Sequence, residues 1–473
     1  MPGKMHVVML PWSAFGHMIP FFHLAIAIAK AGIRVSLVST PRNIQRLPKP
    51  PPNLSSLIKF VELPFPVMEN GSILPEGAEA TVDMPFEKIQ YLKAALDLLQ
   101  HPFKQYVADT SPDWIIIDFF SHWVSSIARE HGVPLVYFSV FSASTLAFLG
   151  PAYSLVGDGR RRLRPSPESM TSPPEWISFP SSVAFKGYEA KVVYSGFFTD
   201  NASGTTDAAR YVEIIHSCQA VAVRSCVEYE GEYLNLLGNL MGKPVIPVGL
   251  LPPEKPEGRE IQITDGSWGE NFKWLNEQKP KSVVFVGFGS ECKLTKDQVH
   301  EIAYGLELSG LPFLWALRKP GWAIEDADAL PSGFSGRTSG RGMVCMGWAP
   351  QMEILAHPSI GGSLFHSGWG SVIETLQFGH CLIVLPIIID QGLNARLLVE
   401  KGLAVEVERR EDGSFSREDI AKSLRLAMVS EEGEKLRIHA REAAAIFGDP
   451  KLHQDHYIGG FVEYLKTGFA KQK

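Results

Sequence analysis

The sequence is poor in cysteine and lacks a long hydrophobic run. Its 473 residues include five cysteines, and no two of them form a Cys-x-x-Cys pair. Cysteines this few and scattered exclude a disulfide framework and argue against a structural zinc site, so we expect buried, reduced thiols. The apolar stretch 21–29 is far shorter than the ~20 residues of a membrane-spanning helix, and neither end resembles a targeting segment. The sequence therefore predicts a cytoplasmic protein without a membrane span.

The sequence also lacks an excess of basic residues. It has 45 Lys and Arg against 51 Asp and Glu, a formal net charge of −6. A nucleic-acid partner would require a basic surface, so DNA or RNA binding is excluded on charge. Hydrophobic residues make up 45% and charged residues 20% of the chain, as in an ordinary globular protein. At ~150 residues per domain, the length predicts two to three domains.

Several common nucleotide and nucleophile motifs are missing. No G-x-G-x-x-G follows a predicted strand, and neither a phosphate-binding G-x-x-x-x-G-K-[ST] loop nor a G-x-S-x-G turn occurs. Gly287-Phe288-Gly289 lacks the third glycine of the dinucleotide motif. Asp326-Ala327-Asp328 has a form that can hold a metal ion, but no apolar strand precedes it. We expect a solvated loop there, and no metal cofactor.

The chain alternates short apolar runs with helical patterns, which is typical of parallel α/β sheets. Strands are predicted at 6–10, 33–38, 114–117, 134–138, 282–286, 313–317, 343–346, 363–365 and 381–385. Helices are predicted through 24–27 (with Pro20 in the first turn), at 296–309 and through 372–376. A proline-rich, charged stretch at 244–268 reads as a linker. The sequence therefore predicts two doubly wound α/β domains, at 1–243 and 269–452, and an amphipathic C-terminal helix within 453–473.

Polar residues follow several of these strands. Ligands of open parallel sheets bind beyond the carboxyl ends of the strands. The candidates placed there are His17, Asp118, Ser290, His366 and Asp390. We expect these side chains to carry the chemistry.

The densest motif lies at 348–391. Residues 366–371 (His-Ser-Gly-Trp-Gly-Ser) join a strand to a helix, where two glycines and Ser371 at the helix N-terminus favour an anionic group such as phosphate. Glu374, one helical turn on, can accept hydrogen bonds from ribose hydroxyls. Trp348 offers a flat face on which a base could stack, a contact worth ~1–3 kcal/mol. Each feature alone has an ordinary structural explanation, but together they predict a nucleotide site.

The stretch from Trp348 to Gln391 resembles, in length and residues, the signature box of plant secondary-product UDP-glycosyltransferases. Further similarities are Phe15-Gly16-His17, Ser225-Cys226-Val227-Glu228, Trp274-Leu275 and Gly289-Ser290. The subgroup that adds a sugar to an existing glycoside is the most similar. That similarity rests on the Phe-Gly-His turn, Thr40-Pro41-Arg42-Asn43 and Ser111-Pro112-Asp113-Trp114.

The resemblance implies a GT-B-like fold, with the active site in a cleft between an acceptor-binding N-terminal domain and a UDP-sugar-binding C-terminal domain. It implies that the C-terminal helix packs back on the N-terminal domain. It also implies donor-binding roles: Trp348 on uracil with Gln351 nearby, Glu374 on the ribose, Ser290, His366 and Ser371 on the diphosphate, Trp369, Asp390 and Gln391 on the sugar, and Ala349, Gly368 and Gly370 along the site. Two positions depart from the family pattern: Ser367 stands for the usual Cys, which we expect to be harmless, and Gly370 for a common Asn, which removes one side-chain contact.

His17 and Asp118 are the candidate catalytic pair. An imidazole, with an ordinary pKa near 6.5, can deprotonate a hydroxyl at neutral pH. A carboxylate can orient it, as in a Ser-His-Asp triad. Alone, His17 would more often be a packing histidine and Asp118 a strand-end residue; the resemblance implies that they act together. The implied reaction is sugar transfer to a hydroxyl with inversion, without a covalent enzyme intermediate.

The substrates are less constrained by the sequence. Gln391 favours UDP-glucose in family terms, while UDP-rhamnose, or a non-catalytic nucleotide-sugar-binding protein, stays an alternative. The acceptor would be a terpenoid, steroid or flavonoid glycoside, shaped by segments 79–85, 141–153 and 185–198, and the protein a monomer. The candidate acceptor contacts are Phe15, Phe148, Tyr194 and Phe197.

Overall fold

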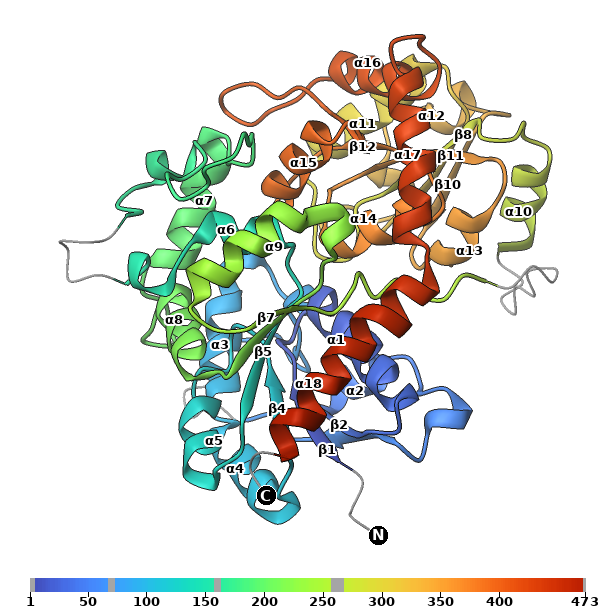
Figure 1. Ribbon diagram of the computed structural model, residues 1–473. Helices are drawn as coiled ribbons and strands as arrows, with labels where there is room; N and C mark the ends of the chain where they lie inside the picture. The colour runs from blue at the N-terminus through green and yellow to red at the C-terminus, as the bar shows by residue number, and fades with distance from the viewer. Residues whose placement is uncertain (1–4, 67–72, 157–162, 257–267, 471–473) are drawn as a thin grey trace. The chain divides into compact units, whose positions relative to one another are not determined.

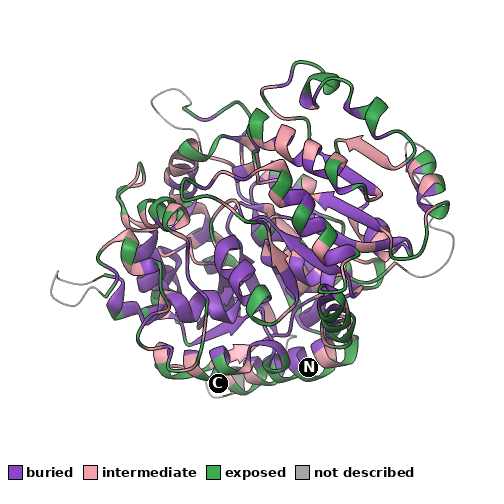
Figure 2. Cartoon of the chain, turned by 90° about the horizontal axis from the view of Figure 1, so that it is seen from above, coloured by how far each residue is buried: buried purple, intermediate pink, exposed green. Residues whose placement is uncertain are grey.

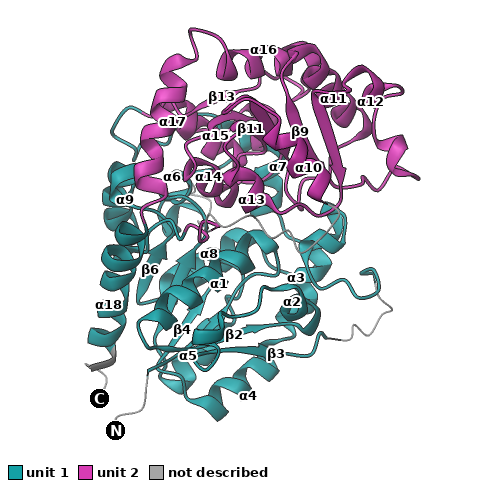
Figure 3. Ribbon diagram, turned by 90° about the vertical axis from the view of Figure 1, so that its right-hand side faces the viewer, with its two compact units in different colours: residues 1–180, 191–251, 450–473 teal, residues 181–190, 252–449 magenta. Residues whose placement is uncertain are grey.

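A computed structural model describes residues 5–66, 73–156, 163–256 and 268–470. The chain divides into two compact units (Figures 1 and 3). Unit 1 comprises residues 1–180, 191–251 and 450–473, and unit 2 comprises residues 181–190 and 252–449. Part of the linker predicted at 244–268, residues 257–267, lies outside the described residues, as do residues 471–473 of the predicted C-terminal helix.

Unit 1 is built on a seven-stranded parallel sheet of order β3-β2-β1-β4-β5-β6-β7. Its strands are β1 (His6–Leu10), β2 (Arg34–Ser39), β3 (Ile58–Glu62), β4 (Trp114–Ile117), β5 (Leu135–Ser139), β6 (Ala220–Val223) and β7 (Val245–Pro247). The strands predicted at 6–10 and 114–117 coincide with β1 and β4, and the prediction of a parallel sheet is confirmed. The residues of β4 and β5 are all buried, as expected for strands covered on both faces. Figure 2 shows most strands in the purple of buried residues.

The helices of unit 1 follow the strands along the chain. They are α1 (Phe15–Lys30), α2 (Pro41–Arg46), α3 (Ile89–Asp97), α4 (Gln100–Thr110), α5 (Val124–His131), α6 (Ala143–Leu149), α8 (Asp207–Ser217) and α9 (Val227–Met241). A further helix, α7 (Gly187–Phe198), begins within unit 2 and ends within unit 1.

The start of α1 differs from the prediction. The helix begins at Phe15, so Pro20 lies inside it and not in its first turn. A proline inside a helix removes the hydrogen bond to the carbonyl four residues earlier, here Gly16. Gly16 is exposed, and no heavy atom lies within 4 Å of the position its Cβ would take. The helix nevertheless continues through Pro20 to Lys30. His17 consequently lies on the first turn of the helix.

The C-terminal segment belongs to the core of unit 1. It forms a π-helix (Lys451–Ile458) followed by α18 (Gly459–Ala470). Phe461 and Leu465 are completely buried in the same hydrophobic cluster as Trp114 of β4. The Trp114 indole N–H donates to the Leu465 carbonyl at 3.1 Å, and a Cβ on Gly468 would come within 2.6 Å of the Trp114 ring. Close packing against a strand thus selects a glycine in α18.

Unit 2 contains a six-stranded parallel sheet of order β10-β9-β8-β11-β12-β13. Its strands are β8 (Val283–Gly287), β9 (Phe313–Leu317), β10 (Gly342–Met346), β11 (Ile360–Phe365), β12 (Cys381–Val384) and β13 (Ala404–Glu406). The strand predicted at 313–317 coincides with β9, and the others agree to within one to three residues at each end. Trp315 and Phe313 of β9 are fully buried and anchor the core.

The helices of unit 2 are α10 (Gly269–Asn276), α11 (Lys296–Ser309), α12 (Phe334–Arg337), α13 (Gln351–Ala356), α14 (Trp369–Leu376), α15 (Gln391–Glu400), α16 (Arg417–Met428) and α17 (Glu434–Phe447). The helix predicted at 296–309 coincides with α11. It starts with a capping box: the Thr295 hydroxyl accepts from the Gln298 N–H at 3.3 Å, and the Gln298 side chain accepts from the Thr295 N–H at 3.0 Å.

Two histidines, the half-buried His23 and the completely buried His380, make the fold sensitive to acid. Burial, aided by the Arg224 cation, lowers the pKa of His23 to about 3, and burial with Lys281 lowers that of His380 to about 3. Both stay neutral in the folded chain, while the unfolded chain takes up protons below pH ~6.5. Folding stability is therefore fully present above that pH and falls with acid, by about 2 kcal/mol per histidine at pH 5.

We expect the urea midpoint to fall between pH 7.5 and pH 5, and the fall to be smaller in His380→Gln. The exposed His101 supplies the matched control, because His101→Gln should leave the pH dependence unchanged. A midpoint that does not change with pH would contradict the effect.

Candidate active site

The sheet of unit 1 changes direction between β1 and β4. The chain leaves β1 toward β2 and β3 and later returns to place β4 on the other side of β1, with Leu10 paired to Ile117 at the carboxyl ends. Ligands bind at such switch points in open parallel sheets. Asp118 directly follows β4, and His17 lies in the first turn of the helix after β1. The topology therefore brings these two predicted residues to one edge.

His17 and Asp118 are joined by a hydrogen bond. The His17 Nδ1 lies 2.8 Å from the Asp118 Oδ2. The same oxygen accepts from the Trp12 N–H at 3.1 Å, and Oδ1 accepts from the Phe119 N–H at 2.8 Å. The Asp118 side chain is 1% exposed and that of His17 11%. Two backbone donors thus fix an almost fully buried carboxylate against the Nδ1 edge of the imidazole.

This contact selects a tautomer of His17. An ionised carboxylate only accepts hydrogen bonds, so the Nδ1 atom carries the proton and the neutral ring keeps its lone pair on Nε2. Chemically, Nε2 can take a proton from a hydroxyl while Asp118 stabilises the imidazolium that forms. The arrangement is that of a general base with its orienting group.

Two phenylalanines hold the imidazole from the sides. The ring centroid of His17 lies 5.6 Å from that of Phe119 and 5.3 Å from that of Phe141. Phe119 was not among the residues predicted from the sequence, and Phe141 was included only as the first residue of the predicted acceptor segment 141–153. The contact of both rings with His17 is purely tertiary. A signal was nevertheless present: Phe119 and Phe141 follow β4 and β5, whose carboxyl ends lie at the same edge.

Phe141 is supported by a buried glutamate. Glu230, 1% exposed, accepts from the backbone N–H groups of Ala143 and Ser144 at 3.1 and 2.8 Å, at the N-terminus of α6. It also accepts from the Ser225 hydroxyl at 2.5 Å. A carboxylate is favourable at a helix N-terminus, because it satisfies donors that the helix leaves free. Glu230 therefore fixes the start of α6, next to Phe141.

The predicted acceptor contacts separate in the structure. Phe15 is half-buried beside His17, with the Arg46 guanidinium 5.6 Å from its ring centroid. Tyr194 and Phe197 both contact Phe198 of α7, at ring separations of 4.7 and 5.0 Å. Phe148 is a correction: it is completely buried, so its ring cannot reach a ligand. It is a core residue of α6.

The sheet of unit 2 has the same kind of switch point, between β8 and β11. Gly287 and Phe365 pair at the carboxyl ends of these strands. Ser290 lies three residues after β8, and His366 directly follows β11. The sites predicted on separate strands therefore lie at one edge of this sheet as well.

His366 lies between two glycines. A Cβ on Gly289, whose φ is +68°, would lie 3.0 Å from the His366 Cε1, and one on Gly368 would lie 2.6 Å from its Nε2. Any side chain at Gly368 would collide with the imidazole, so the glycines make room for the ring. Burial lowers the pKa of His366 to about 4, and among the described residues its Nδ1 has no hydrogen-bond partner. At neutral pH His366 is therefore uncharged, and its Nδ1 remains available for a hydrogen bond.

Helix α14 begins next to His366 with Gly368 as its N-cap. The first N–H groups of a helix lack intrahelical partners and favour anions. Ser371 adds a hydroxyl in the first turn, while Gly370 adds none. Trp369 is 4% exposed and packs edge-on against Phe447, with ring centroids 6.4 Å apart. Its ring therefore belongs to the core, and its backbone is the part available to a ligand.

Gln351 and Glu374, predicted to serve the base and the ribose, are in direct contact. The Gln351 Nε2 donates to the Glu374 Oε2 at 2.6 Å. Trp348, three residues before Gln351, is 73% exposed, and Ala349 is half-buried. An indole this exposed leaves apolar area uncovered, which suits a platform for a flat ligand.

The Trp348 platform can be tested by truncation. Stacking on an aromatic ring contributes ~1–3 kcal/mol, so we expect Trp348→Ala to weaken UDP binding by about 5–150-fold. The thermal midpoint should stay the same, because the indole is exposed. Ile324, 81% exposed, supplies the matched control, since Ile324→Ala removes an exposed apolar side chain elsewhere in unit 2. Calorimetry that gives the same Kd for both variants would refute the stacking role.

The side-chain amide of Gln391 makes most of its hydrogen bonds within the protein. Its Oε1 accepts from the backbone N–H groups of Ile387 and Ile388, both at 2.9 Å, and its Nε2 lies 3.7 Å from the Cys292 Sγ. The residue is 5% exposed. The carbonyl end therefore holds the loop before α15, and the N–H₂ end is the part with remaining hydrogen-bond capacity.

Ser367 ties the two ends of the motif together. Its hydroxyl donates to the Gln391 carbonyl at 2.8 Å, and its own carbonyl accepts from the Asn394 Nδ2 at 3.1 Å. The same Asn394 nitrogen donates to the Asp390 Oδ2 at 2.8 Å. The serine found where the family usually has cysteine therefore makes a specific hydrogen bond between the β11 and α15 loops.

The remaining sequence candidate is Asp326-Ala327-Asp328. It lies in a 3₁₀ turn, Asp326–Ala329, where Asp328 accepts from the Glu325 N–H at 2.8 Å. Across the described ranges, no group of three or more His, Cys, Asp or Glu side chains is placed to hold a metal ion. None of the helices in those ranges has the length and apolar character to cross a membrane.

Comparison with known proteins identifies the class. A family model described as "UDP-glucoronosyl and UDP-glucosyl transferase" matches residues 267–435. UDP-glycosyltransferase 91A1 of Arabidopsis thaliana is 46% identical over 98% of this chain and 97% of its own. Soyasaponin III rhamnosyltransferase of Glycine max is 41% identical, over 98% and 95%. The crystal structure of Glycyrrhiza uralensis UGT73P12, complexed with glycyrrhetinic acid 3-O-monoglucuronide, has a TM-score of 0.77 at 25% identity over 99% and 97%.

These similarities extend over nearly the whole chain, not only over the motif. The chain belongs to the plant UDP-glycosyltransferase family and has the two-domain GT-B fold. It is thus a UDP-sugar-dependent glycosyltransferase, as the residues of the 348–391 stretch predicted.

Proposed function

We propose that this enzyme transfers glucose from UDP-glucose, with inversion, to a hydroxyl on the sugar of an existing natural-product glycoside. The observation that carries the proposal is the 2.8 Å contact between the His17 Nδ1 and the Asp118 Oδ2 at the switch point of unit 1. It supplies a base of the kind that attack by a hydroxyl requires. We assign acceptor binding to unit 1 and UDP-sugar binding to unit 2.

In this scheme the His17 Nε2 removes the proton of the acceptor hydroxyl. The oxygen attacks the anomeric carbon from the face opposite UDP, and the bond from that carbon to the β-phosphate oxygen breaks. UDP leaves with the electron pair, and the proton stays on His17, where Asp118 balances the charge. One displacement inverts the anomeric centre and needs no covalent enzyme intermediate.

The leaving diphosphate would be met by groups of unit 2. Ser290, Ser371 and the first N–H groups of α14 can donate hydrogen bonds to it. His366 would act as a neutral donor, because burial lowers its pKa to about 4. The His366 Nδ1 has no hydrogen-bond partner among the described residues, so it remains available for a hydrogen bond. The proposal invokes no metal ion.

The donor sugar has a second candidate. The soybean relative, 41% identical, is named a rhamnosyltransferase, so UDP-rhamnose is the alternative donor. Two similar proteins support the choice of a glycoside acceptor. The soybean relative is named for soyasaponin III, and the Glycyrrhiza protein was crystallised with a monoglucuronide; both names describe those proteins.

A substrate matrix tests the proposal. UDP-glucose, UDP-rhamnose and UDP-galactose are each incubated with flavonoid, terpenoid and steroid aglycones and with their monoglucosides, and products are weighed by mass spectrometry. We expect a hexose increment on monoglucosides only. A deoxyhexose increment would establish rhamnose instead. Transfer to bare aglycones would overturn the glycoside assignment, and UDP binding without any product would favour a nucleotide-sugar-binding protein.

A further inference from the structure

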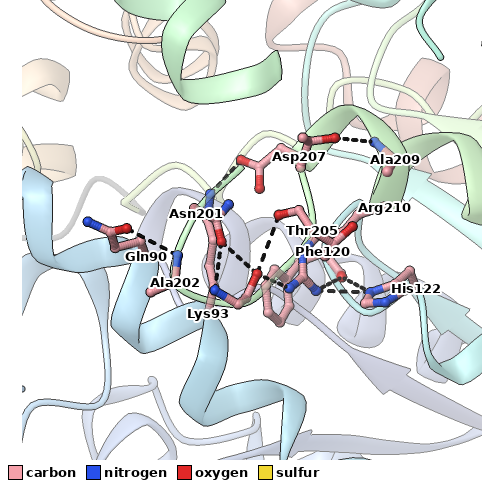
Figure 4. Close-up of polar contacts among 12 residues, drawn as sticks. Gln90, Lys93, Phe120, His122, Asn201, Ala202, Thr205, Asp207, Ala209 and Arg210 are labelled. Atoms are coloured by element: carbon pink, nitrogen blue, oxygen red, sulfur yellow. Dashed lines mark hydrogen bonds and ion pairs between the residues drawn. The ribbon is translucent and has the colours of Figure 1, made fainter. Parts of the chain in front are cut away.

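The guanidinium of Arg210, on α8, holds the loop that follows β4. Arg210 is completely buried. Its Nη1 donates to the Phe120 carbonyl at 3.3 Å and to the His122 Nδ1 at 2.9 Å. Its Cζ lies 4.4 Å from the centroid of the Phe120 ring. Figure 4 shows the guanidinium between Phe120 and His122. The Arg210 side chain thus contacts the loop at three groups: the Phe120 ring, the Phe120 carbonyl and the His122 imidazole.

The charge of Arg210 is balanced from another element. Both oxygens of Asp97, at the end of α3, accept from the guanidinium, the Oδ1 at 2.8 Å. The Ser203 hydroxyl accepts from Nη2 at 2.7 Å. A buried cation needs such a partner, and Asp97 provides it. The contacts of Arg210 with Phe120 and His122 are not needed to balance its charge. Burial and the Arg210 cation lower the pKa of His122, which keeps its Nδ1 free to accept.

Asp118 is the first residue of the loop that Arg210 contacts. The Phe120 ring lies 4.4 Å from the Trp12 ring, and the Trp12 N–H donates to the Asp118 Oδ2 at 3.1 Å. The Phe119 N–H donates to the other oxygen at 2.8 Å. Phe120 is therefore next to both residues whose backbone N–H groups hold the carboxylate: its ring contacts the Trp12 ring, and Phe119 directly precedes it in the chain. A shift of Phe120 would move Asp118 relative to His17.

We propose that Arg210 is a positioning residue that keeps Asp118 on the Nδ1 of His17. The inference rests on the proposed function, since it assigns Arg210 a role through that pair. A planar guanidinium reaches Asp97, Ser203 and Phe120 at once, whereas the ammonium of lysine donates from a single nitrogen. Arg210→Lys keeps the charge and loses this geometry.

We expect Arg210→Lys to lower kcat by about 10–100-fold, the cost of a small displacement at a reacting group. The KM for the UDP-sugar should be unchanged, because that site lies in unit 2. The second readout needs no turnover: the hydrogen-bonded Nδ1 proton of His17 should give a downfield resonance in a ¹⁵N-histidine-labelled NMR spectrum. The resonance is assigned by its absence from His17→Ala.

Arg164→Lys is the matched control. Arg164 is also buried, its Cζ lies 4.3 Å from the Phe148 ring centroid, and it donates to the carbonyl of the same residue at 2.7 Å. It has no link to the loop after β4 in these contacts. Loss of the resonance in Arg210→Lys with its retention in Arg164→Lys is the expected result.

Three results would overturn the proposal: the resonance persists in Arg210→Lys, both arginine variants lose it, or the wild-type chain lacks it. Failure of the proposed function would look different. The substrate matrix would then give no product from the wild type, while the resonance would still report whether Arg210 positions the pair.

Discussion

Replacing His17 by alanine is expected to reduce kcat by about 10²–10⁴-fold, the usual contribution of a general base. The loss should appear with every acceptor, because the acceptor proton has no other recipient in the proposed mechanism. UDP binding, measured by calorimetry, should be unchanged, since the proposed donor-binding groups lie on unit 2. Product formation is followed by mass spectrometry with the best pair from the substrate matrix.

A second variant separates chemistry from packing. His17 is held between Phe119 and Phe141, and alanine would leave a hole there. Glutamine fills more of that space and can still donate to Asp118, but it cannot accept a proton at neutral pH. We therefore expect His17→Gln to lose as much kcat as His17→Ala. Near-normal turnover in either variant would remove His17 from the mechanism.

Asp118→Asn is expected to lower kcat by about 10⁴-fold, as when the carboxylate of a triad becomes an amide. With its oxygen accepting from the Phe119 N–H, the amide presents its N–H₂ group to His17, at the position of the oxygen that His17 and the Trp12 N–H share in the aspartate. The Nδ1 atom of His17 must then accept, which places the proton on Nε2. The imidazole would face the acceptor as a donor, so the base would be lost although the ring stays in place.

Asp113 provides the control for this variant. It lies just before β4, at the other end from Asp118, and accepts from the His6 N–H at 2.8 Å. Asp113→Asn should leave kcat within about twofold, because its hydrogen bond is remote from the carboxyl end of β4. The Asp118 role would be refuted if both aspartate variants retained turnover, or if Asp118→Asn mainly raised the KM for the UDP-sugar.

Most of the strands and the unit-2 motif were readable from the sequence. Strands β3, β6, β7 and β13 were not predicted, and β7 lies within the stretch 244–268 that was interpreted as a linker. Buried parallel strands are short apolar runs, and this local signal placed β1, β4, β9 and helix α11 at the observed residues. The 348–391 motif was equally readable, because its residues lie close along the chain. The start of helix α1 was predicted wrongly, since a proline usually lies in the first turn of a helix, whereas α1 begins five residues before Pro20.

The surroundings of the proposed catalytic pair were not readable, because they are assembled from distant residues. Phe119 and Phe141 show only that they follow β4 and β5, Glu230 carries no local signature of its role, and Arg210 resembles an ordinary helical arginine. Phe148 looked like a possible ligand contact, and only its complete burial shows that it belongs to the core. Side-chain exposure is a tertiary quantity, and a single sequence does not report it.

By itself, the sequence determined the class of fold, the UDP-glycosyltransferase class of the enzyme, and the edge of each sheet at which its candidate site residues lie. Those properties depend on local periodicity and on residue types at short spacing. The tertiary structure alone decided that a hydrogen bond joins His17 to Asp118 across 101 residues, that the glycines around His366 make room for its ring, and that Trp348 is exposed while Trp369 is buried. These features depend on which strands are neighbours, and strand order is set by packing of the whole chain.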